Sequence, residues 1–232
     1  LLLGLKNLQA FYHFLANNAE ACSKMHAQAL AVASETGIHL ISPIVVGHGA
    51  AGALSAGDID TADEHLGHMA GYAHNFDWIY IYFKIFKMWK ALLEKDYEMA
   101  LLEGESAKTH VADSGMPMTD AVWHQGMAIA WHASGSQAEA SQYLEKALLL
   151  SNRVGFHQIQ FGCYLTQAEF ALDAGDETAA CHSLEKAMAL GSAKQYVTTW
   201  YWRPDAMTRL CLKALEAHIE VDYVQHLIRC RR

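Results

Sequence analysis

The residues that most resemble a chemical site form the glycine motif Gly47-His48-Gly49-Ala50-Ala51-Gly52, which follows the strand-like stretch 38–46. In a dinucleotide-binding fold, such glycines make a tight turn and let a pyrophosphate approach a helix N-terminus. That fold also needs a second strand ending in an acidic residue about 20 positions later. Here that region reads Asp63-Glu64-His65-Leu66 inside a helical pattern. We therefore expect no nucleotide cofactor, and the glycines are predicted to lie on a closely packed helix.

Histidine is abundant, with 14 residues, and His65, His68 and His74 lie near one another in the sequence. Zinc needs three or four ligands, and two histidines on one helix normally have i, i+4 spacing. His65 and His68 are i, i+3 neighbours, and no cysteine or second acidic residue lies in phase with them. The sequence therefore predicts no metal and no cofactor. A metal-assisted hydrolase is the enzyme alternative, and bound metal would support it.

A cysteine could also be catalytic, because a thiol paired with a histidine can act as a nucleophile. Cys163 stands in the apolar helical stretch Phe161-Gly162-Cys163-Tyr164, which favours a buried structural thiol. The 5 cysteines are widely spaced and form no Cys-x-x-Cys pair. This usage is typical of reduced thiols, so we expect a cytoplasmic protein. Because neither the histidines nor Cys163 form a convincing catalytic site, we expect a protein that is not an enzyme.

Composition and charge exclude several classes of protein. The chain has 232 residues, of which 52% are hydrophobic and 18% charged, and its formal net charge is −8. A disordered tail is excluded, and the scarcity of proline favours helices. Phosphate binding needs clustered Lys and Arg, so we expect no direct contact with nucleic acid. Polar residues interrupt the apolar stretches 38–56 and 78–86 before they reach the roughly 20 residues that a bilayer requires, so no membrane contact is expected.

Basic residues nevertheless gather near the end of the chain. Six of the 17 Lys and Arg are Arg203, Arg209, Lys213, Arg229, Arg231 and Arg232. A solvated helix face is one interpretation, and a change of charge toward a further domain is the other. The chain starts at Leu1 without a Met and stops in a basic run, so we expect a piece of a longer protein.

A pattern that recurs about every 40 residues organises the whole chain. A turn residue is followed at +5 by a small residue, at +9 by a bulky one and often at +12 by Ala. The clearest copies are Gly135-Ala140-Leu144-Ala147 and Gly175-Ala180-Leu184-Ala187. The turn residue lets the chain reverse, and the small residue lets the second helix approach the first. Further copies start at Gly57 and Lys95, and degenerate ones at Ala16 and His218.

The repeat predicts an all-α fold, a right-handed superhelical α-solenoid of about six helical hairpins with a repeat near 40 residues. The predicted units are 1–40, 41–76, 77–116, 117–156, 157–198 and 199–232. The spacing within 135–147 and 175–187 resembles the tetratricopeptide (TPR) superfamily. Such long units, with the closing segment 202–229, resemble the sensor regions of large bacterial transcription regulators of the maltose-regulator-like or activator type.

That resemblance implies a single TPR-like domain over 1–232, in a chain that also carries an ATPase and a DNA-binding domain. It implies a non-catalytic ligand-sensing or protein-interaction module in signal transduction. A passive TPR scaffold that joins domains or subunits without a small ligand is the alternative. The expected partners are protein or peptide segments, including flanking domains of the same chain, or a sugar-like small-molecule effector.

First helices line the concave face of this fold, so positions counted back from each turn predict the groove. The groove residues predicted in this way are Tyr82, Trp89, Gln125 and Glu169. Aromatic rings can stack on a sugar or peptide, and amide and carboxylate groups can hydrogen-bond to it. The alternative is that the aromatic side chains fill space between units, and an exposed aromatic would separate the two interpretations.

Overall fold

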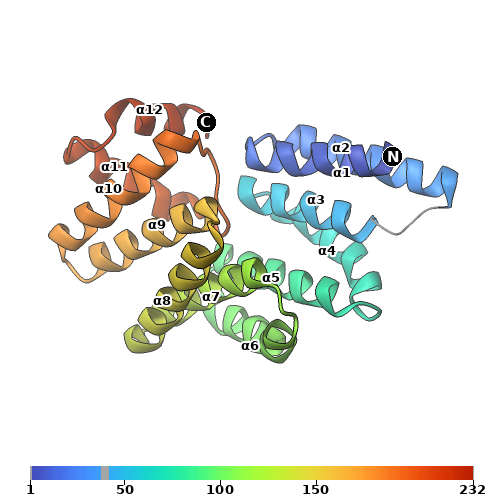
Figure 1. Cartoon of the computed structure of the whole chain (residues 1–232), viewed down its shortest axis with the longest axis horizontal. Coiled ribbons are helices and arrows are strands. Elements are labelled where there is room, and N and C mark those ends of the chain that lie inside the picture. The colour runs from blue at the N-terminus through green and yellow to red at the C-terminus, as the bar shows by residue number, and fades with distance from the viewer. Residues whose placement is uncertain (1, 38–41, 232) are drawn as a thin grey trace. The chain divides into compact units, whose positions relative to one another are not determined.

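The computed structural model describes residues 2–37 and 42–231, and within these ranges it contains 12 α-helices and no strand (Figure 1). The predicted all-α fold is confirmed for this part of the chain. The helices are α1 (Leu2–Leu15), α2 (Ala19–Thr36), α3 (Ser42–Ala56), α4 (Ile59–Ala73), α5 (Asp77–Leu93), α6 (Tyr97–Asp113), α7 (Pro117–Ala133), α8 (Gln137–Val154), α9 (His157–Asp173), α10 (Glu177–Lys194), α11 (Pro204–Glu216) and α12 (Val221–Arg229).

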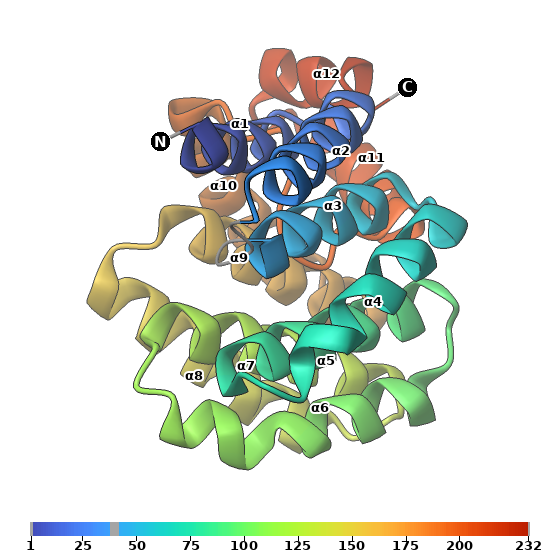
Figure 2. The ribbon, with the colours of Figure 1, turned by 90° about the vertical axis from the view of Figure 1, so that its right-hand side faces the viewer.

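Consecutive helices pack in pairs, so that each predicted unit contains one helical hairpin. The pairs are α1 with α2, α3 with α4, α5 with α6, α7 with α8, α9 with α10, and α11 with α12. Figure 2 shows the paired helices running alongside each other. The six predicted hairpins are therefore present in the described residues.

The turns between paired helices use the predicted anchor residues. Gly57, Gly135 and Gly175 have φ angles of 77°, 91° and 73°, which lie in the left-handed region that favours glycine. The next residue is then the N-cap of the second helix. Asp58 and Asp176 each accept a hydrogen bond from a backbone N–H of the first turn, at 3.0 and 2.9 Å. Both parts of the turn are thus local properties of the sequence.

The small residues predicted at +5 lie where the helices of a hairpin meet. Ala62, Ala100, Ala140 and Ala180 all have 0% of their surface exposed. A larger side chain at these positions would force the two helices apart. The small residue of the repeat therefore has the steric role that the sequence predicted.

The helices group into two compact units, Leu1–Ser114 and Gly115–Arg232. The division falls after the third hairpin, so each unit holds three predicted repeats. Each unit buries its own large apolar side chains, such as Ile81 and Ile85 in the first, and Phe161 and Leu165 in the second. The single domain expected over the whole chain stays a prediction.

The glycine motif lies in α3, and residues 42–46 of the preceding strand-like stretch are helical as well. Residues 38–41 lie outside the described ranges. A Cβ on Gly52 would lie 3.1 Å from Sγ of Cys22, and one on Gly47 would lie 3.4 Å from the ring of Phe86. The prediction that these glycines serve close helix packing is confirmed.

Among the helices of the described ranges, none combines the length and the apolar character needed to cross a bilayer.

Candidate functional site

The four predicted groove residues divide between the two units. Tyr82 and Trp89 lie on α5 in the first unit, whereas Gln125 on α7 and Glu169 on α9 lie in the second. The structure brings Gln125 and Glu169 to one small polar cavity. Each pair is described below within its own unit.

The two aromatic members of the predicted groove are largely covered. Trp89 has 0% of its surface exposed and belongs to the largest fully buried side chains. Tyr82 is half-buried, and its ring centroid lies 6.1 Å from that of Phe86. A ring without exposed surface presents no face to a ligand. The burial of Trp89 therefore favours the alternative that this aromatic side chain fills space between helices.

The polar cavity of the second unit lies between α7, α9 and the segment that leads into α11. Its polar lining comes from Gln125, Thr166, Glu169, Thr199 and Arg203. The cavity has a volume of about 20 Å³, enough for a single water molecule and far smaller than a sugar. In this conformation the cavity is a polar core site and does not admit an organic ligand.

Gln125 is the most buried polar group of this cavity, with 1% of its surface exposed. Its Nε2 donates to Oγ1 of Thr166 at 3.4 Å, and Thr166 in turn donates to the carbonyl of Gly162 at 2.9 Å. Oε1 of Gln125 has no hydrogen-bond partner within the described part of the chain. A buried amide oxygen without a donor is costly, and one bound water would satisfy it.

Glu169 is already engaged by an arginine that the groove prediction did not include. Arg203 donates through Nη1 to Oε1 of Glu169 at 2.9 Å and through Nη2 to Oε2. This bidentate pair uses both carboxylate oxygens, so Glu169 is held by the residue that precedes α11 and is not presented to a ligand.

Two further basic residues near the end of the chain, Arg209 and Lys213, also pair with carboxylates. Asp173 accepts a hydrogen bond from Arg209 at 2.5 Å and contacts Nε2 of His132 at 2.8 Å. Partial burial raises the pKa of Asp173, but the hydrogen bonds from Arg209 and His132 outweigh it and hold that pKa below its usual value. Lys213 donates to Glu177 at 2.7 Å.

Arg231 is also a packing residue. Its guanidinium lies 3.7 Å from the ring centroid of Trp202, and it donates to Oγ1 of Thr198 at 2.6 Å. Burial lowers the pKa of Arg231 to about 9. The interpretation of the basic cluster as a solvated helix face is therefore wrong for Arg203 and Arg231, which are drawn into the second unit by the contacts described above.

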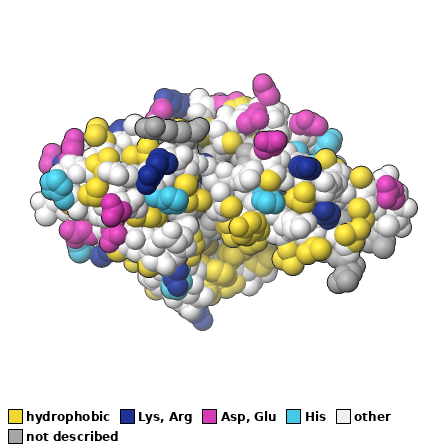
Figure 3. Space-filling view, turned by 90° about the horizontal axis from the view of Figure 1, so that it is seen from above, with side chains coloured by type: hydrophobic (Ala, Val, Ile, Leu, Met, Phe, Trp, Pro, Cys, Tyr) yellow, Lys and Arg dark blue, Asp and Glu magenta, His cyan; other side chains and the backbone are white. Residues whose placement is uncertain are grey.

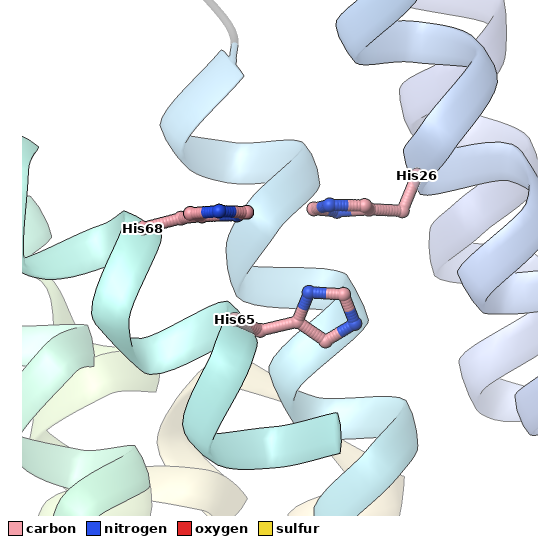
Figure 4. A group of neighbouring side chains, drawn as sticks. All are labelled: His26, His65 and His68. Atoms are coloured by element: carbon pink, nitrogen blue, oxygen red, sulfur yellow. The ribbon is translucent and has the colours of Figure 1, made fainter. Parts of the chain in front are cut away.

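The first unit contains a cluster of three histidines. His26 on α2, His65 on α4 and His68 on α4 each offer a ligand atom, and these atoms all lie within 4.8 Å of one another. Figure 4 shows the three imidazoles converging beside α3, with His26 and His68 approaching from opposite sides. Burial, followed by the neighbouring histidines, lowers the pKa of His65 to about 4, so His65 is neutral at pH 7.

His26 is not among the predicted ligands, because it lies far from His65 along the chain. A signal was present, however, since His26 precedes His65 by about one repeat length. Residues one repeat apart occupy similar positions in neighbouring hairpins and can therefore meet in space. No metal is expected from the sequence because no third ligand lies in phase with His65 and His68. In the folded unit, His26 supplies that third ligand.

Cys163 has 0% of its surface exposed, and burial raises its pKa above the usual value. A thiol with a raised pKa is a poor nucleophile at neutral pH. The predicted buried thiol is thus confirmed.

In comparisons with protein-family models, curated proteins and solved structures, nothing matches the chain.

Proposed function

We propose that this chain is a non-catalytic helical-repeat module that binds a helical segment of a protein, in the sensor region of a bacterial transcription regulator. Binding would shift the population of conformations of the repeat array and so bias its contacts with flanking ATPase or DNA-binding domains. The observation that carries the proposal is an apolar face on α1 that no described residue covers.

This face is formed by Leu5, Leu8 and Tyr12, which are 52%, 64% and 65% exposed. Their spacing of three and four residues places them on one side of the helix. The opposite side of α1 carries Ala10 and Phe14, which are 0% and 1% exposed. Hydrophobic side chains are visible at the surface of the protein in the view of Figure 3. The helix is therefore apolar on both sides, and one of these sides is uncovered.

An amphipathic helix is the partner that fits such a face best. Three large apolar side chains in a helical row match the spacing of anchors on a second helix. Burying the exposed part of each side chain would contribute about 1–2 kcal/mol to binding, before the costs of association. Exposed apolar surface of this kind marks interaction sites in soluble proteins.

A second candidate, the passive TPR scaffold, is favoured by the small size of the polar cavity in the second unit. The cavity beside Gln125 holds about 20 Å³, and Arg203 occupies both carboxylate oxygens of Glu169. Both features disfavour a sugar-like effector at the predicted groove residues. A scaffold would use the α1 face for assembly alone and would transmit no signal.

The proposal includes a right-handed superhelix with a repeat near 40 residues. The repeat length is supported by a set of contacts in the second unit between residues separated by 40 or 41 positions. These contacts join Gln125 to Thr166, His132 to Asp173, and Gln158 to Thr198. Equal separations are expected where neighbouring hairpins stack in the same register.

The test measures binding of the chain to the flanking ATPase and DNA-binding segments that the proposal invokes, each produced separately, by calorimetric titration. We expect one segment to bind, and Leu8→Ser to weaken that binding about 10-fold or more because a buried apolar contact is lost. Leu149→Ser is the matched control, since Leu149 is 68% exposed on α8 in the other unit. Equal weakening by both changes, or the absence of binding to either segment, contradicts the proposal.

Sensing and scaffolding are separated by repeating the titration in the presence of a panel of sugars and short peptides. A sensor predicts that at least one of these compounds changes the affinity for the adjoining segment, because a ligand must bind the two conformations unequally to transmit a signal. A scaffold predicts the same affinity with every compound.

A further inference from the structure

We infer that His26, His65 and His68 form a binding site for a divalent transition-metal ion of the zinc class. The site lies within the first unit and joins α2 to α4 beside α3. It is independent of the α1 face, so it stands whether or not that face binds a partner.

The geometry of the three histidines is close to that of a bound ion. Their ligand atoms lie within 4.8 Å of one another. Bond lengths of about 2.0–2.1 Å and tetrahedral angles require zinc-bound nitrogens to stand about 3.3 Å apart. Small rotations of the imidazoles close this difference, because the three rings already converge on one region of space (Figure 4).

His65 supplies a second, independent indication. It is 5% exposed, and neither of its ring nitrogens has a hydrogen-bond partner among the described residues. A buried imidazole without partners costs free energy, because its polar nitrogens have lost their hydration. A metal ion bound to one nitrogen removes that cost. Imidazole is, in addition, a preferred ligand of zinc, copper, nickel and iron.

Gly49 lies on α3, and its lack of a side chain leaves space for the imidazoles of His26 and His65. A Cβ at this position would stand 3.0 Å from Nδ1 of His26 and 3.0 Å from Nε2 of His65. Any larger residue would therefore push the two imidazoles away from the positions in which they meet. Gly49 belongs to the motif that resembles a nucleotide-binding loop, and its local role is to admit the histidine rings.

A backbone group orients His26. Its Nδ1 lies 3.4 Å from the carbonyl oxygen of Val45, and the tautomer that donates this hydrogen bond leaves Nε2 with a lone pair that can bind an ion. Metal-bound histidines commonly donate their other ring nitrogen to a carbonyl or carboxylate, which fixes the ring. His26 is thus held by α3 in an orientation that suits coordination.

The exposed position of His68 leaves one side of the site open to solvent. Three protein ligands with an open fourth position are the arrangement in which zinc keeps a water molecule or accepts an outside ligand. Because the ligands come from two helices, the ion would also hold α2 and α4 together. Metal occupancy would therefore stabilise the first unit.

The test uses the whole chain without a histidine tag, stripped of metal by a chelator and titrated with Zn²⁺. We expect one ion per chain and a rise in Tm of about 5–10 °C when free zinc is about 100 times its Kd. Co²⁺ in place of Zn²⁺ should give the visible absorption bands of a four-coordinate ion with nitrogen ligands. These bands report coordination directly and do not depend on stability.

His68→Ala is the informative variant, because His68 is exposed and its removal leaves the core intact. It should weaken zinc binding by at least about 100-fold, since even the loss of a group that only orients a ligand costs 10–100-fold. His74→Ala is the matched control, because His74 is an exposed histidine at the end of the same helix and lies outside the cluster. Unchanged zinc affinity in His68→Ala, equal weakening in both variants, or the absence of stoichiometric uptake overturns the inference.

Discussion

Arg203 donates hydrogen bonds to both carboxylate oxygens of Glu169 and thereby ties the start of α11 to α9. The two side chains are 20% and 9% exposed, so both charges have lost much of their hydration. A bidentate contact between planar groups offsets that loss better than a single bond would. The pair therefore holds the last hairpin of the second unit in register with the hairpin before it.

Replacing Arg203 by Ala should destabilise the chain by about 3 kcal/mol. The reason is that Glu169 would remain buried with its charge uncompensated, which costs more than the attraction of the intact pair contributes. The free energy of unfolding, measured by urea denaturation and followed by circular dichroism, gives this difference directly.

Arg209→Ala is the matched control for that change. Arg209 also pairs with a carboxylate on α9, Asp173, but it is 51% exposed. An ion pair accessible to solvent contributes less than about 1 kcal/mol. Similar losses for the two arginine variants would show that the burial of the Glu169 pair does not matter, and would contradict the interpretation.

The hairpins could be predicted from the sequence because their signals are local. A turn residue such as Gly135 and a small residue such as Ala140 act within a few positions of one another, and their spacing fixes one helix pair. The same pattern repeated along the chain predicts the same structure each time. No knowledge of distant contacts is needed for this step.

The sites could not be predicted in the same way, because they depend on contacts between hairpins. Trp89 was placed in the groove by counting positions back from a turn, and an error of one residue rotates a side chain by about 100° around its helix. Because Trp89 has 0% of its surface exposed, its ring cannot face a groove as the counting predicts. The partnership of His26 with His65 depends on how neighbouring hairpins cross and on which rotamers their side chains adopt. Neither the crossing of the hairpins nor the rotamers can be predicted from the spacing of residues along one helix.

Glu103 provides a prediction for the dependence of stability on pH. It is buried on α6, accepts a hydrogen bond from Lys84 at 2.6 Å and also pairs with Lys87. Burial raises the pKa of Glu103, but the two lysines outweigh burial and hold that pKa below the usual value of 4.5. Glu103→Gln should therefore lower the free energy of unfolding by about 2 kcal/mol at pH 7.

The sign of the pH effect follows from this lowered pKa. A carboxyl that releases its proton more readily in the folded state stabilises that state above about pH 4.5, and the contribution is lost as the pH falls through the folded pKa. The difference between wild type and Glu103→Gln should thus shrink in urea titrations below pH 4.5. Glu98→Gln, an exposed change on the same helix, should shift stability by less than about 0.5 kcal/mol. A constant difference from pH 7 to pH 3 would contradict the assignment.

Gly162 tests how tightly the polar core of the second unit is packed. A Cβ at this position would clash with Oγ1 of Thr199 and would lie 2.7 Å from Nε2 of Gln125. Gly162→Ala should therefore destabilise the chain by about 1–3 kcal/mol, although alanine favours a helix more than glycine does. The measurement is again urea denaturation at neutral pH.

Gly67→Ala is the same substitution in a helix where space is available, and it should have the opposite sign. Gly67 is exposed on α4, and an added Cβ would meet no atom of the described chain within 4 Å. The change should stabilise the chain by about 0.5–1 kcal/mol, because alanine loses less backbone entropy on folding. Opposite signs for the two variants would show that Gly162 is retained for packing against Gln125 and Thr199. A stabilising Gly162→Ala would instead mean that the segment carrying Thr199 moves freely away from α9.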